Sequence, residues 1–282
     1  MARARLDSEL VRAGLARSRR HAGELIMAGR VSIDGVPAAK SATPLESGQV
    51  VQVAPSAAPD YASRAGHKLA GALDALGDLR VEGRICLDAG ASTGGFTDVL
   101  LRRGAAHVVA VDVGHGQLVH ALRADPRVTV REGVNVRHLH PGDVGPAPDL
   151  IVGDLSFISL TLVLPALAAV GAPGADLLLL VKPQFEVGRE RLGSGGVVRD
   201  PRLRAQAVLS VARSAAALGR RTRAVVASPL PGPSGNVEYF VWLVAHADGV
   251  GEVDGALSSL VDCVVAGGPT GENTGWTSGG DQ

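Results

Sequence analysis

Strands and helices alternate along most of this 282-residue chain, and this alternation constrains its fold more than any other feature. From Tyr61 onward, short apolar runs such as DLIVGD and ADLLLLVK are separated by longer segments with helical periodicity. The pattern predicts an α/β fold with a doubly wound, mostly parallel sheet. The expected strands are Arg84–Asp88, His107–Asp112, Val128–Arg131, Leu150–Asp154, Leu177–Lys182, Ala224–Ser228 and Glu238–Ala245.

The last two expected strands are joined differently from the others. Their connection, Pro229–Val237, is rich in Pro and Gly and too short for a crossover helix, so we expect antiparallel neighbours with the last strand running against the sheet. Helices are expected at His67–Leu79, Phe96–Arg103, Gln117–Arg123, Ile158–Ala169, Arg202–Leu218 and Glu252–Ala266.

A smaller unit precedes this sheet. Residues 1–54 show two helical patterns, Asp7–Gly14 and Ser18–Ala28, followed by the strands VSID and QVVQVA and a turn at Asp34-Gly35. This order predicts a small α+β domain. The stretch PSAAPD places a linker at 55–62, so the larger domain covers 63–266, and the Gly-rich tail 267–282 is expected to be disordered.

Composition excludes several classes of protein. The two cysteines, Cys86 and Cys263, lack metal-ligand spacing, so we expect neither a metal site nor a disulfide framework. The N-terminus MARARLDSEL lacks the apolar core of a secretory signal, and the apolar stretch 160–171 is interrupted by Pro165 and too short to span a bilayer. We therefore expect a cytoplasmic protein without a membrane partner. Separately, we expect a monomer.

The motif DAGASTGGFT follows the first strand of the sheet and opens a helix. Glycines there allow a tight turn and a close approach of backbone N–H groups to a ligand, although they could also serve packing alone. Asp112, which ends the next strand, lies where a carboxylate binds the ribose of an adenosine cofactor. The loop does not separate a dinucleotide from S-adenosylmethionine. The candidate cofactor-binding residues are Asp88, Gly90, Ala91, Ser92, Thr93, Gly94, Gly95, Phe96, Asp112 and Asp154.

Four polar residues mark the edge of the expected sheet. Asp154 and Lys182 close two apolar runs, and Glu238 opens a third. Lys68 lies ahead of the glycine-rich loop. Ligands bind open α/β sheets at the carboxyl ends of the strands, where an antiparallel strand also begins, so we expect the four side chains to meet there.

Two lysines with two carboxylates suit removal of a proton from a weak acid. Methyl transfer to a ribose 2′-hydroxyl needs such help, whereas hydride transfer does not. A lysine can act as the base when burial or a second ammonium group destabilises its protonated form. Taken singly, each residue is equally well explained as a surface salt bridge, and Asp154 could instead N-cap the following helix.

Basic residues gather in the small domain. A solvated charged face is the ordinary explanation, but the absence of an aromatic platform beside them favours structured RNA over single-stranded bases as a partner. The candidate RNA-binding residues are Arg3, Arg5, Arg17, Arg19, Arg20 and Arg30.

Residues 5–53, with RLDSELVRAGLARSRRHAGELIMAGRVSIDG, resemble an S4 RNA-binding domain, and residues 61–246 resemble the FtsJ-type ribose 2′-O-methyltransferases. With CLDAGASTGGFTDVLL, GDLSFISL, LVKPQFEVG and SPLPGPSGNVEYFVWL, the chain is similar to the TlyA family, which methylates ribosomal RNA and carries a historical haemolysin label. The resemblance implies S-adenosylmethionine as methyl donor and cytidine 2′-hydroxyls of rRNA, within ribosomal subunits, as acceptors.

The resemblance also implies roles for the four polar residues. The Lys-Asp-Lys-Glu tetrad of related enzymes falls on Lys68, Asp154, Lys182 and Glu238, and we expect Lys182 to be the base. Family members with an extended N-terminal helix modify both subunits, which favours 16S and 23S rRNA here because Met1–Arg17 is present. The competing hypotheses are a non-catalytic ribosome-assembly factor, a membrane-lytic haemolysin and, from the loop alone, a dinucleotide oxidoreductase.

Overall fold

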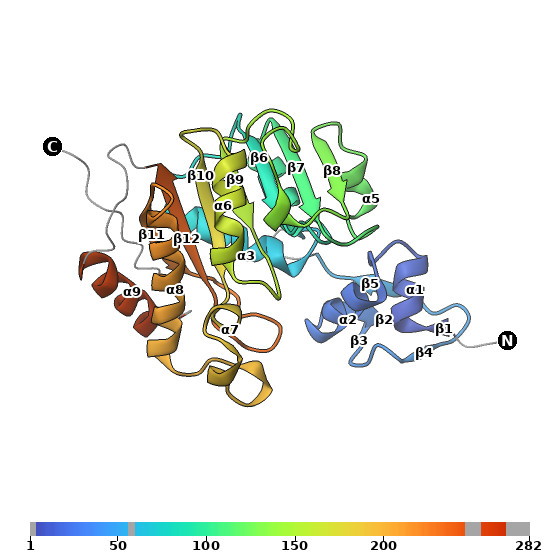
Figure 1. Cartoon of the computed structure of the whole chain (residues 1–282). Coiled ribbons are helices and arrows are strands. Elements are labelled where there is room, and N and C mark those ends of the chain that lie inside the picture. The colour runs from blue at the N-terminus through green and yellow to red at the C-terminus, as the bar shows by residue number, and fades with distance from the viewer. Residues whose placement is uncertain (1–3, 56–59, 246–254, 269–282) are drawn as a thin grey trace. The chain divides into compact units, whose positions relative to one another are not determined.

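A computed structural model describes residues 4–55, 60–245 and 255–268 of the chain (Figure 1). The chain divides into two compact units, Met1–Asp60 and Tyr61–Gln282. This division falls inside the segment predicted as a linker, of which residues 56–59 lie outside the described residues. Arg3, the start of the last predicted helix (252–254) and nearly all of the predicted disordered tail (269–282) also lie outside them.

The first unit is a small α+β domain, as predicted. Ser18 N-caps the second helix by accepting a hydrogen bond from the backbone N–H of His21, and the turn at Asp34 and Gly35 has positive φ at both residues. Leu6, Leu10, Leu25, Ile26, Val31 and Leu45 belong to its core. The elements are β1 (Ala4–Arg5), α1 (Leu6–Arg12), α2 (Arg19–Met27), β2 (Val31–Ile33), β3 (Val36–Pro37), β4 (Pro44–Leu45) and β5 (Val51–Val53).

In the described part of the second unit, seven strands form one sheet in the order β11-β12-β10-β9-β6-β7-β8. Strands β6 to β10 are parallel, and β12 runs antiparallel to both β10 and β11. The prediction of a mostly parallel sheet with an antiparallel last strand is therefore confirmed. The strands are β6 (Ile85–Ala89), β7 (His107–Asp112), β8 (Val128–Glu132), β9 (Leu150–Gly153), β10 (Asp176–Val181), β11 (Arg220–Ala227) and β12 (Tyr239–Ala245).

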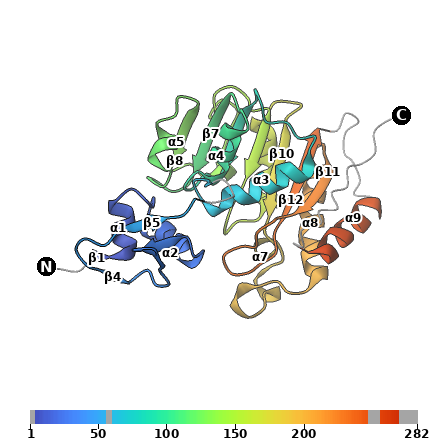
Figure 2. The ribbon, with the colours of Figure 1, turned by 180° about the vertical axis from the view of Figure 1, so that it is seen from behind.

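Helices cover both faces of this sheet. α6 and α8 pack on one face, seen in front in Figure 1, and α3 and α4 pack on the other, seen in front in Figure 2. Two apolar cores result, one containing Leu164 and Val208 and the other containing Leu69 and Leu100. The helices are α3 (Arg64–Leu76), α4 (Gly95–Arg102), α5 (His120–Arg123), α6 (Leu160–Val170), α7 (Pro183–Glu186), α8 (Pro201–Ala216) and α9 (Gly255–Gly267).

Three predicted elements differ from those observed by three residues or more at one end or both. The helix predicted at His67–Leu79 is α3 (Arg64–Leu76), which begins and ends three residues earlier. The helix predicted from Gln117 begins only at His120, because the residues before it lie against the glycine-rich loop: Ser92 Oγ contacts Gln117 Oε1 at 3.2 Å. Strand β11 begins at Arg220, four residues before the predicted start, although its first residues are charged. Its partner β12 pairs with both ends of it, with a register shift between Thr222 and Ala224, and a pattern of apolar residues does not reveal this pairing.

No helix in the part of the chain that the structure describes is long and apolar enough to cross a membrane.

Candidate active site

Strand register brings three of the four predicted catalytic residues to one edge of the sheet. Val181 pairs with Tyr239, so Lys182 and Glu238 are the next residues beyond this antiparallel pair. Gly153 pairs with Leu179 in parallel, which places Asp154 at the same carboxyl edge. α7 follows β10 directly and marks this edge in Figure 1.

The four side chains form two ion pairs. Lys68 Nζ, which reaches the edge from α3, donates to Glu238 Oε2 at 2.5 Å, and the two side chains are only 7% and 1% exposed. Lys182 Nζ lies 2.6 Å from Asp154 Oδ1, with exposures of 9% and 15%. Burial on this scale excludes the surface salt bridges that each residue alone allowed. Asp154 is also no N-cap, because α6 begins at Leu160 with Ser159 as its cap.

Ser156 belongs to the same site and was missed in the sequence. Its hydroxyl accepts a hydrogen bond from Lys182 Nζ at 2.7 Å, so the lysine is held between Asp154 and Ser156. The signal lay in the motif GDLSF, where this serine follows the aspartate by two residues. No rule of spacing or periodicity distinguishes it from an ordinary loop serine.

Glu186 joins the two segments that carry Asp154 and Lys182, and it too was missed. Lying at the end of α7, its carboxylate accepts hydrogen bonds from Ser159 Oγ at 2.5 Å and from the backbone N–H of Leu160 at 2.8 Å. Burial raises the pKa of Glu186 above its ordinary value. This carboxylate therefore fixes the loop after β9 against the helix that follows Lys182.

Phe157 is exposed in an unusual way. Its side chain is 91% exposed, and its backbone has φ of 65°, in the left-handed region that side chains other than glycine rarely adopt. The ring lies 5.2 Å from that of Phe185, centroid to centroid. Phe157 directly follows Ser156, which binds Lys182, and the surrounding structure must impose its strained backbone conformation.

The glycine-rich loop adjoins this site through Gly90. Gly90 has φ of 87°, and a Cβ there would lie 2.9 Å from the backbone oxygen of Asp154. Only glycine therefore lets the loop after β6 approach the loop after β9 so closely. Gly95 has a packing role, since a Cβ on it would meet the backbone of Gly66 in α3 at 2.9 Å. Both glycines thus have a packing role in the structure, and close approach of the loop backbone to a ligand stays a prediction.

Asp88 lies in the interior beneath this loop. It is fully buried, accepts a hydrogen bond from Thr97 Oγ1 at 2.7 Å, and its Oδ1 has no hydrogen-bond partner within the described residues. The pKa of Asp88 is raised to about 7, because burial raises it more than the hydrogen bond from Thr97 lowers it. Among the predicted cofactor residues, those buried in the structure are Asp88, Ala91, Gly94, Gly95 and Phe96, and those that reach solvent are Gly90, Ser92, Thr93, Asp112 and Asp154.

Asp112 closes β7 beside the loop. Its carboxylate accepts hydrogen bonds from the backbone N–H groups of Ser92 at 2.8 Å and Gly114 at 2.7 Å. The loop and Asp112 are thus held together. This arrangement fits an adenosine-type cofactor, because a partly exposed carboxylate at the end of the second strand lies beside the glycine-rich loop. No cluster of three or more metal-ligating side chains occurs among the described residues.

The predicted RNA-binding arginines occupy different environments in the first unit. Arg5 and Arg19 both pair with Asp7, at 2.9 and 3.1 Å, and their hydrogen bonds and charges hold the pKa of Asp7 well below its usual range. Arg30 pairs with Asp60 at 3.0 Å and donates a hydrogen bond to the backbone oxygen of Ala54, so it holds the last residues of the unit. Arg17 is exposed, while Arg3 and the side chain of Arg20 lie outside what the structure describes.

Fold and site together define the second unit as a Rossmann-like methyltransferase domain. Residues 61–245 match the FtsJ-like methyltransferase family, and residues 4–51 match the S4 domain. The 16S/23S rRNA (cytidine-2′-O)-methyltransferase TlyA of Mycobacterium tuberculosis is 59% identical over 246 residues, which cover 87% of this chain and 91% of that protein. Hemolysin A of Brachyspira hyodysenteriae is 37% identical, covering 85% and 99%.

A solved structure agrees with these relatives. A candidate hemolysin from Streptococcus thermophilus is 37% identical and superposes with a TM-score of 0.73, covering 94% of this chain and 96% of the other. The chain belongs to the TlyA family of methyltransferases, in which an S4 domain precedes an FtsJ-like domain. It is therefore an enzyme, as the sequence predicted.

Proposed function

We propose that this protein transfers a methyl group from S-adenosylmethionine to cytidine 2′-hydroxyls of ribosomal RNA in both 16S and 23S rRNA. The observation that carries the chemistry is the pair of buried lysine–carboxylate contacts at the carboxyl edge of the sheet. The acceptor follows from the Mycobacterium tuberculosis relative, which is named for cytidine 2′-O-methylation of both rRNAs, and from the S4 domain.

The loop after β6 and Asp112 would hold the cofactor. Its backbone approaches Asp154 at Gly90, and Asp112 is already oriented by the N–H groups of Ser92 and Gly114. When bound, S-adenosylmethionine supplies an electrophilic methyl group on a positively charged sulfur. Asp88 supports the loop from below through Thr97. The chain's own task is to align the acceptor oxygen and remove its proton.

Lys182 accepts the proton of the 2′-hydroxyl. At rest, Lys182 and Asp154 form an ammonium–carboxylate pair at 2.6 Å, and an ammonium group has no lone pair to accept a proton. Asp154 takes one ammonium proton within the pair, leaving an amine that removes the proton from the hydroxyl as its oxygen bonds the methyl carbon. A bound S-adenosylmethionine would supply the methyl carbon in the same step, its carbon–sulfur bond breaking as the carbon–oxygen bond forms and the electron pair remaining on sulfur. Ser156 keeps the lysine nitrogen oriented throughout.

Lys68 and Glu238 position the site without exchanging this proton. Glu238 Oε1 faces the backbone of Gly232, where a Cβ would lie 2.5 Å away, so the carboxylate has a fixed place beneath the edge. The pair keeps a second ammonium group close to the reaction edge, which opposes further positive charge there.

Phe157 offers a stacking surface for the base of the acceptor nucleotide. Its ring is 91% exposed, lies in the loop that carries Asp154 and Ser156, and has Phe185 behind it. Every base has a π-face, so a solvent-exposed ring next to the proton acceptor can hold a nucleotide turned out of its stack.

The test is transfer of labelled methyl from S-adenosylmethionine to unmodified 30S and 50S subunits, mapped as alkali-resistant linkages. Label at discrete alkali-resistant sites in both subunits is the expected result, because 2′-O-methylation blocks cleavage at the modified ribose. Label in one subunit only would overturn the dual specificity, and cofactor binding without any label would support a non-catalytic assembly factor instead.

A further inference from the structure

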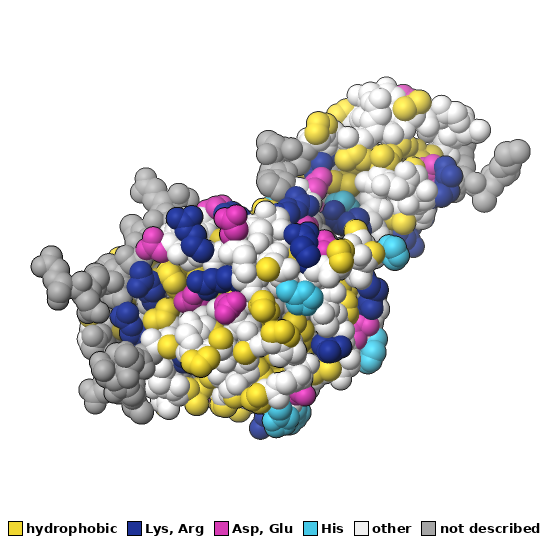
Figure 3. Space-filling view, turned by 90° about the horizontal axis from the view of Figure 1, so that it is seen from above, with side chains coloured by type: hydrophobic (Ala, Val, Ile, Leu, Met, Phe, Trp, Pro, Cys, Tyr) yellow, Lys and Arg dark blue, Asp and Glu magenta, His cyan; other side chains and the backbone are white. Residues whose placement is uncertain are grey.

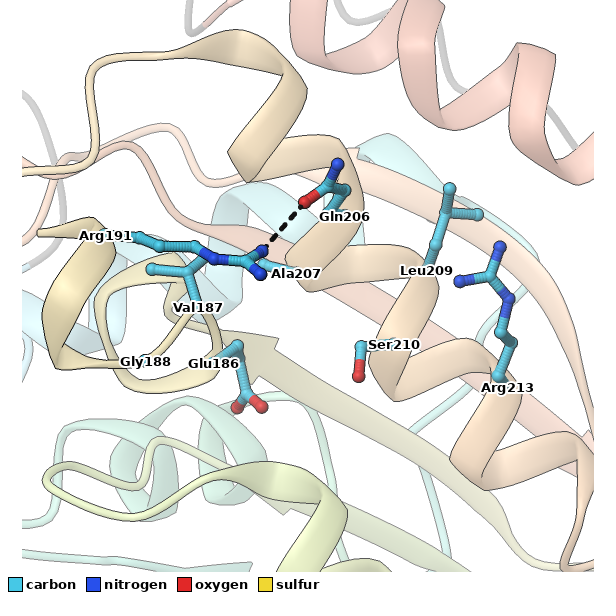
Figure 4. Close-up of a pocket in the computed structure, with 9 residues that line it drawn as sticks. All are labelled: Glu186, Val187, Gly188, Arg191, Gln206, Ala207, Leu209, Ser210 and Arg213. Atoms are coloured by element: carbon cyan, nitrogen blue, oxygen red, sulfur yellow. Dashed lines mark hydrogen bonds between the residues drawn. The ribbon is translucent and has the colours of Figure 1, made fainter.

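A cavity of about 650 Å³ lies between α8 and the segment that follows Lys182 (Figure 4). One wall is a single face of α8, and the other is the end of α7 with the loop behind it. The lining residues are Glu186, Val187, Gly188, Arg191, Gln206, Ala207, Leu209, Ser210 and Arg213.

Two arginines give this cavity its charge. Arg191 and Arg213 lie on opposite sides of it, with residues of α8 between them (Figure 4). In the described part of the chain neither guanidinium pairs with a carboxylate, whereas Arg84, Arg102 and Arg127 each do. On the face that Figure 3 shows, basic and acidic side chains are likewise interspersed.

The remaining polar groups add donors and not negative charge. Gln206 Oε1 accepts a hydrogen bond from Arg191 Nη1 at 3.3 Å, which leaves the amide NH2 as a donor, and Ser210 contributes a hydroxyl. The Glu186 carboxylate is already held by Ser159 and Leu160, and burial raises its pKa, which weakens its repulsion of an anion. Guanidinium groups and neutral N–H and O–H donors are the groups that bind phosphate oxygens in proteins.

The cavity begins close to the reaction site along the chain. α7 is four residues long and starts immediately after Lys182, so Glu186 lies roughly 6 Å further along the helix axis. Glu186 therefore contributes to both the reaction site and the cavity. It accepts a hydrogen bond from the loop that follows Asp154, and it also lines the cavity. An RNA strand whose ribose lies at Lys182 would need to extend only past α7 to bring a neighbouring phosphate to this opening.

We propose that the cavity between α7 and α8 binds backbone phosphate of the RNA that flanks the methylated nucleotide, through Arg191 and Arg213. This inference rests on the proposed function and adds a second RNA contact in the methyltransferase unit, separate from the arginines of the S4 domain. It contributes to RNA affinity and register without touching the reacting atoms.

The experiment compares Arg191→Gln, Arg213→Gln and the double variant with Arg202→Gln, an exposed arginine of the same helix that does not line the cavity. Methyl transfer to the subunits is measured as a function of rRNA concentration and of salt. Each cavity substitution is expected to raise the rRNA KM about tenfold, as a charge-assisted hydrogen bond is lost, and to reduce the salt slope of log KM by about 1.

The same variants should keep the wild-type kcat, cofactor affinity and melting temperature, which separates the effect from misfolding. In the wild type, inorganic phosphate at millimolar concentration should compete with rRNA, and in the double variant it should not. An rRNA KM and salt slope equal to those of Arg202→Gln would overturn the proposal. Competition by phosphate without any change of rRNA KM would assign the cavity to a free phosphate compound and also overturn it.

Failure of the proposed function gives a different result. If the wild type transfers no methyl group to either subunit, the proposed function fails, and direct filter binding of rRNA by the same four variants still decides about the cavity.

Discussion

The two units hold their charged side chains in opposite ways. In the first unit, Asp7 is shared by Arg5 and Arg19, whose side chains are 50% and 60% exposed. In the second, the lysine–carboxylate pairs at the sheet edge are at most 15% exposed. One carboxylate between two exposed guanidinium groups leaves net positive charge at the surface for a polyanion. Buried pairs are expensive to desolvate, and their retention points to chemistry.

Asp7 and Asp88 show that the partner decides the state of a buried carboxylate. Both are almost inaccessible to solvent, at 4% and 0% exposure. Two guanidinium groups hold the pKa of Asp7 well below its usual range, whereas burial against a single threonine raises the pKa of Asp88 to about 7. The first is fixed as an anion, and the second titrates near neutral pH.

The largest effect is expected at the proton acceptor. Lys182→Ala should lower the rate of methyl transfer at least about 100-fold, because it removes the group proposed to take the 2′-hydroxyl proton. Cofactor affinity should stay near that of the wild type. Ser156→Ala is the control, since it removes only an orienting bond, and turnover of Lys182→Ala at the wild-type rate would refute the assignment.

Breaking the Lys68–Glu238 pair, the more buried of the two, should destabilise the fold. Lys68→Met leaves Glu238 buried without a counter-charge and should lower the free energy of unfolding by about 3–5 kcal/mol. Chemical denaturation measures this, with Arg103→Met as the matched control because its pair with Asp74 is largely exposed and worth about 0–1 kcal/mol. Equal losses in both variants would mean that burial does not distinguish the pairs.

Asp88 should make stability depend on pH. The folded protein keeps the Asp88 proton up to about pH 7, while the unfolded chain releases it near pH 3.8, so the folded state binds more protons between these values. The contribution of Asp88 to stability is therefore full below the lower value and lost as pH rises through the upper one. Urea midpoints of wild type and Asp88→Asn at pH 5 and pH 8 should show the wild-type advantage shrinking. A difference between the two urea midpoints that is the same at pH 5 and pH 8 would contradict the raised pKa of Asp88.

Phe157 should affect RNA binding more than folding. Phe157→Ala removes a stacking surface worth about 1–3 kcal/mol per base, which should appear as weaker rRNA binding or a slower step at the acceptor. The melting temperature should not fall, because the ring is 91% exposed. Phe157→Tyr keeps the ring and should retain activity, and a similar loss in both variants would argue against stacking.

The smallest change is expected for the S4 arginines one at a time. Arg5→Gln and Arg19→Gln should each reduce the salt slope of rRNA affinity by about 1, with kcat unchanged at saturating rRNA. Binding titrations at several salt concentrations test this. An unchanged slope would show that these two arginines do not contact rRNA phosphate.

The strands were largely predictable because each central strand is a continuous apolar run. His107–Asp112 has the bounds that the sequence predicted, and register alone then carries Asp154 and Lys182 to one edge. The pairing within the tetrad was not predictable, since which lysine meets which carboxylate depends on the path of the α3 side chains. Ser156 and Glu186 were missed because each acts through a contact across two loops, and neither stands out in a single sequence.

We attribute the chemistry to the second unit and assign the S4 arginines to RNA attachment alone, and single-turnover methyl transfer at saturating rRNA tests this separation most directly. Compared with the wild type, the double variant Arg5→Gln/Arg19→Gln should reach the same rate constant once rRNA saturates, whereas Lys182→Ala should form no product at any rRNA concentration. A Lys182→Ala enzyme restored by more rRNA, or an arginine variant still slow at saturation, would contradict the account.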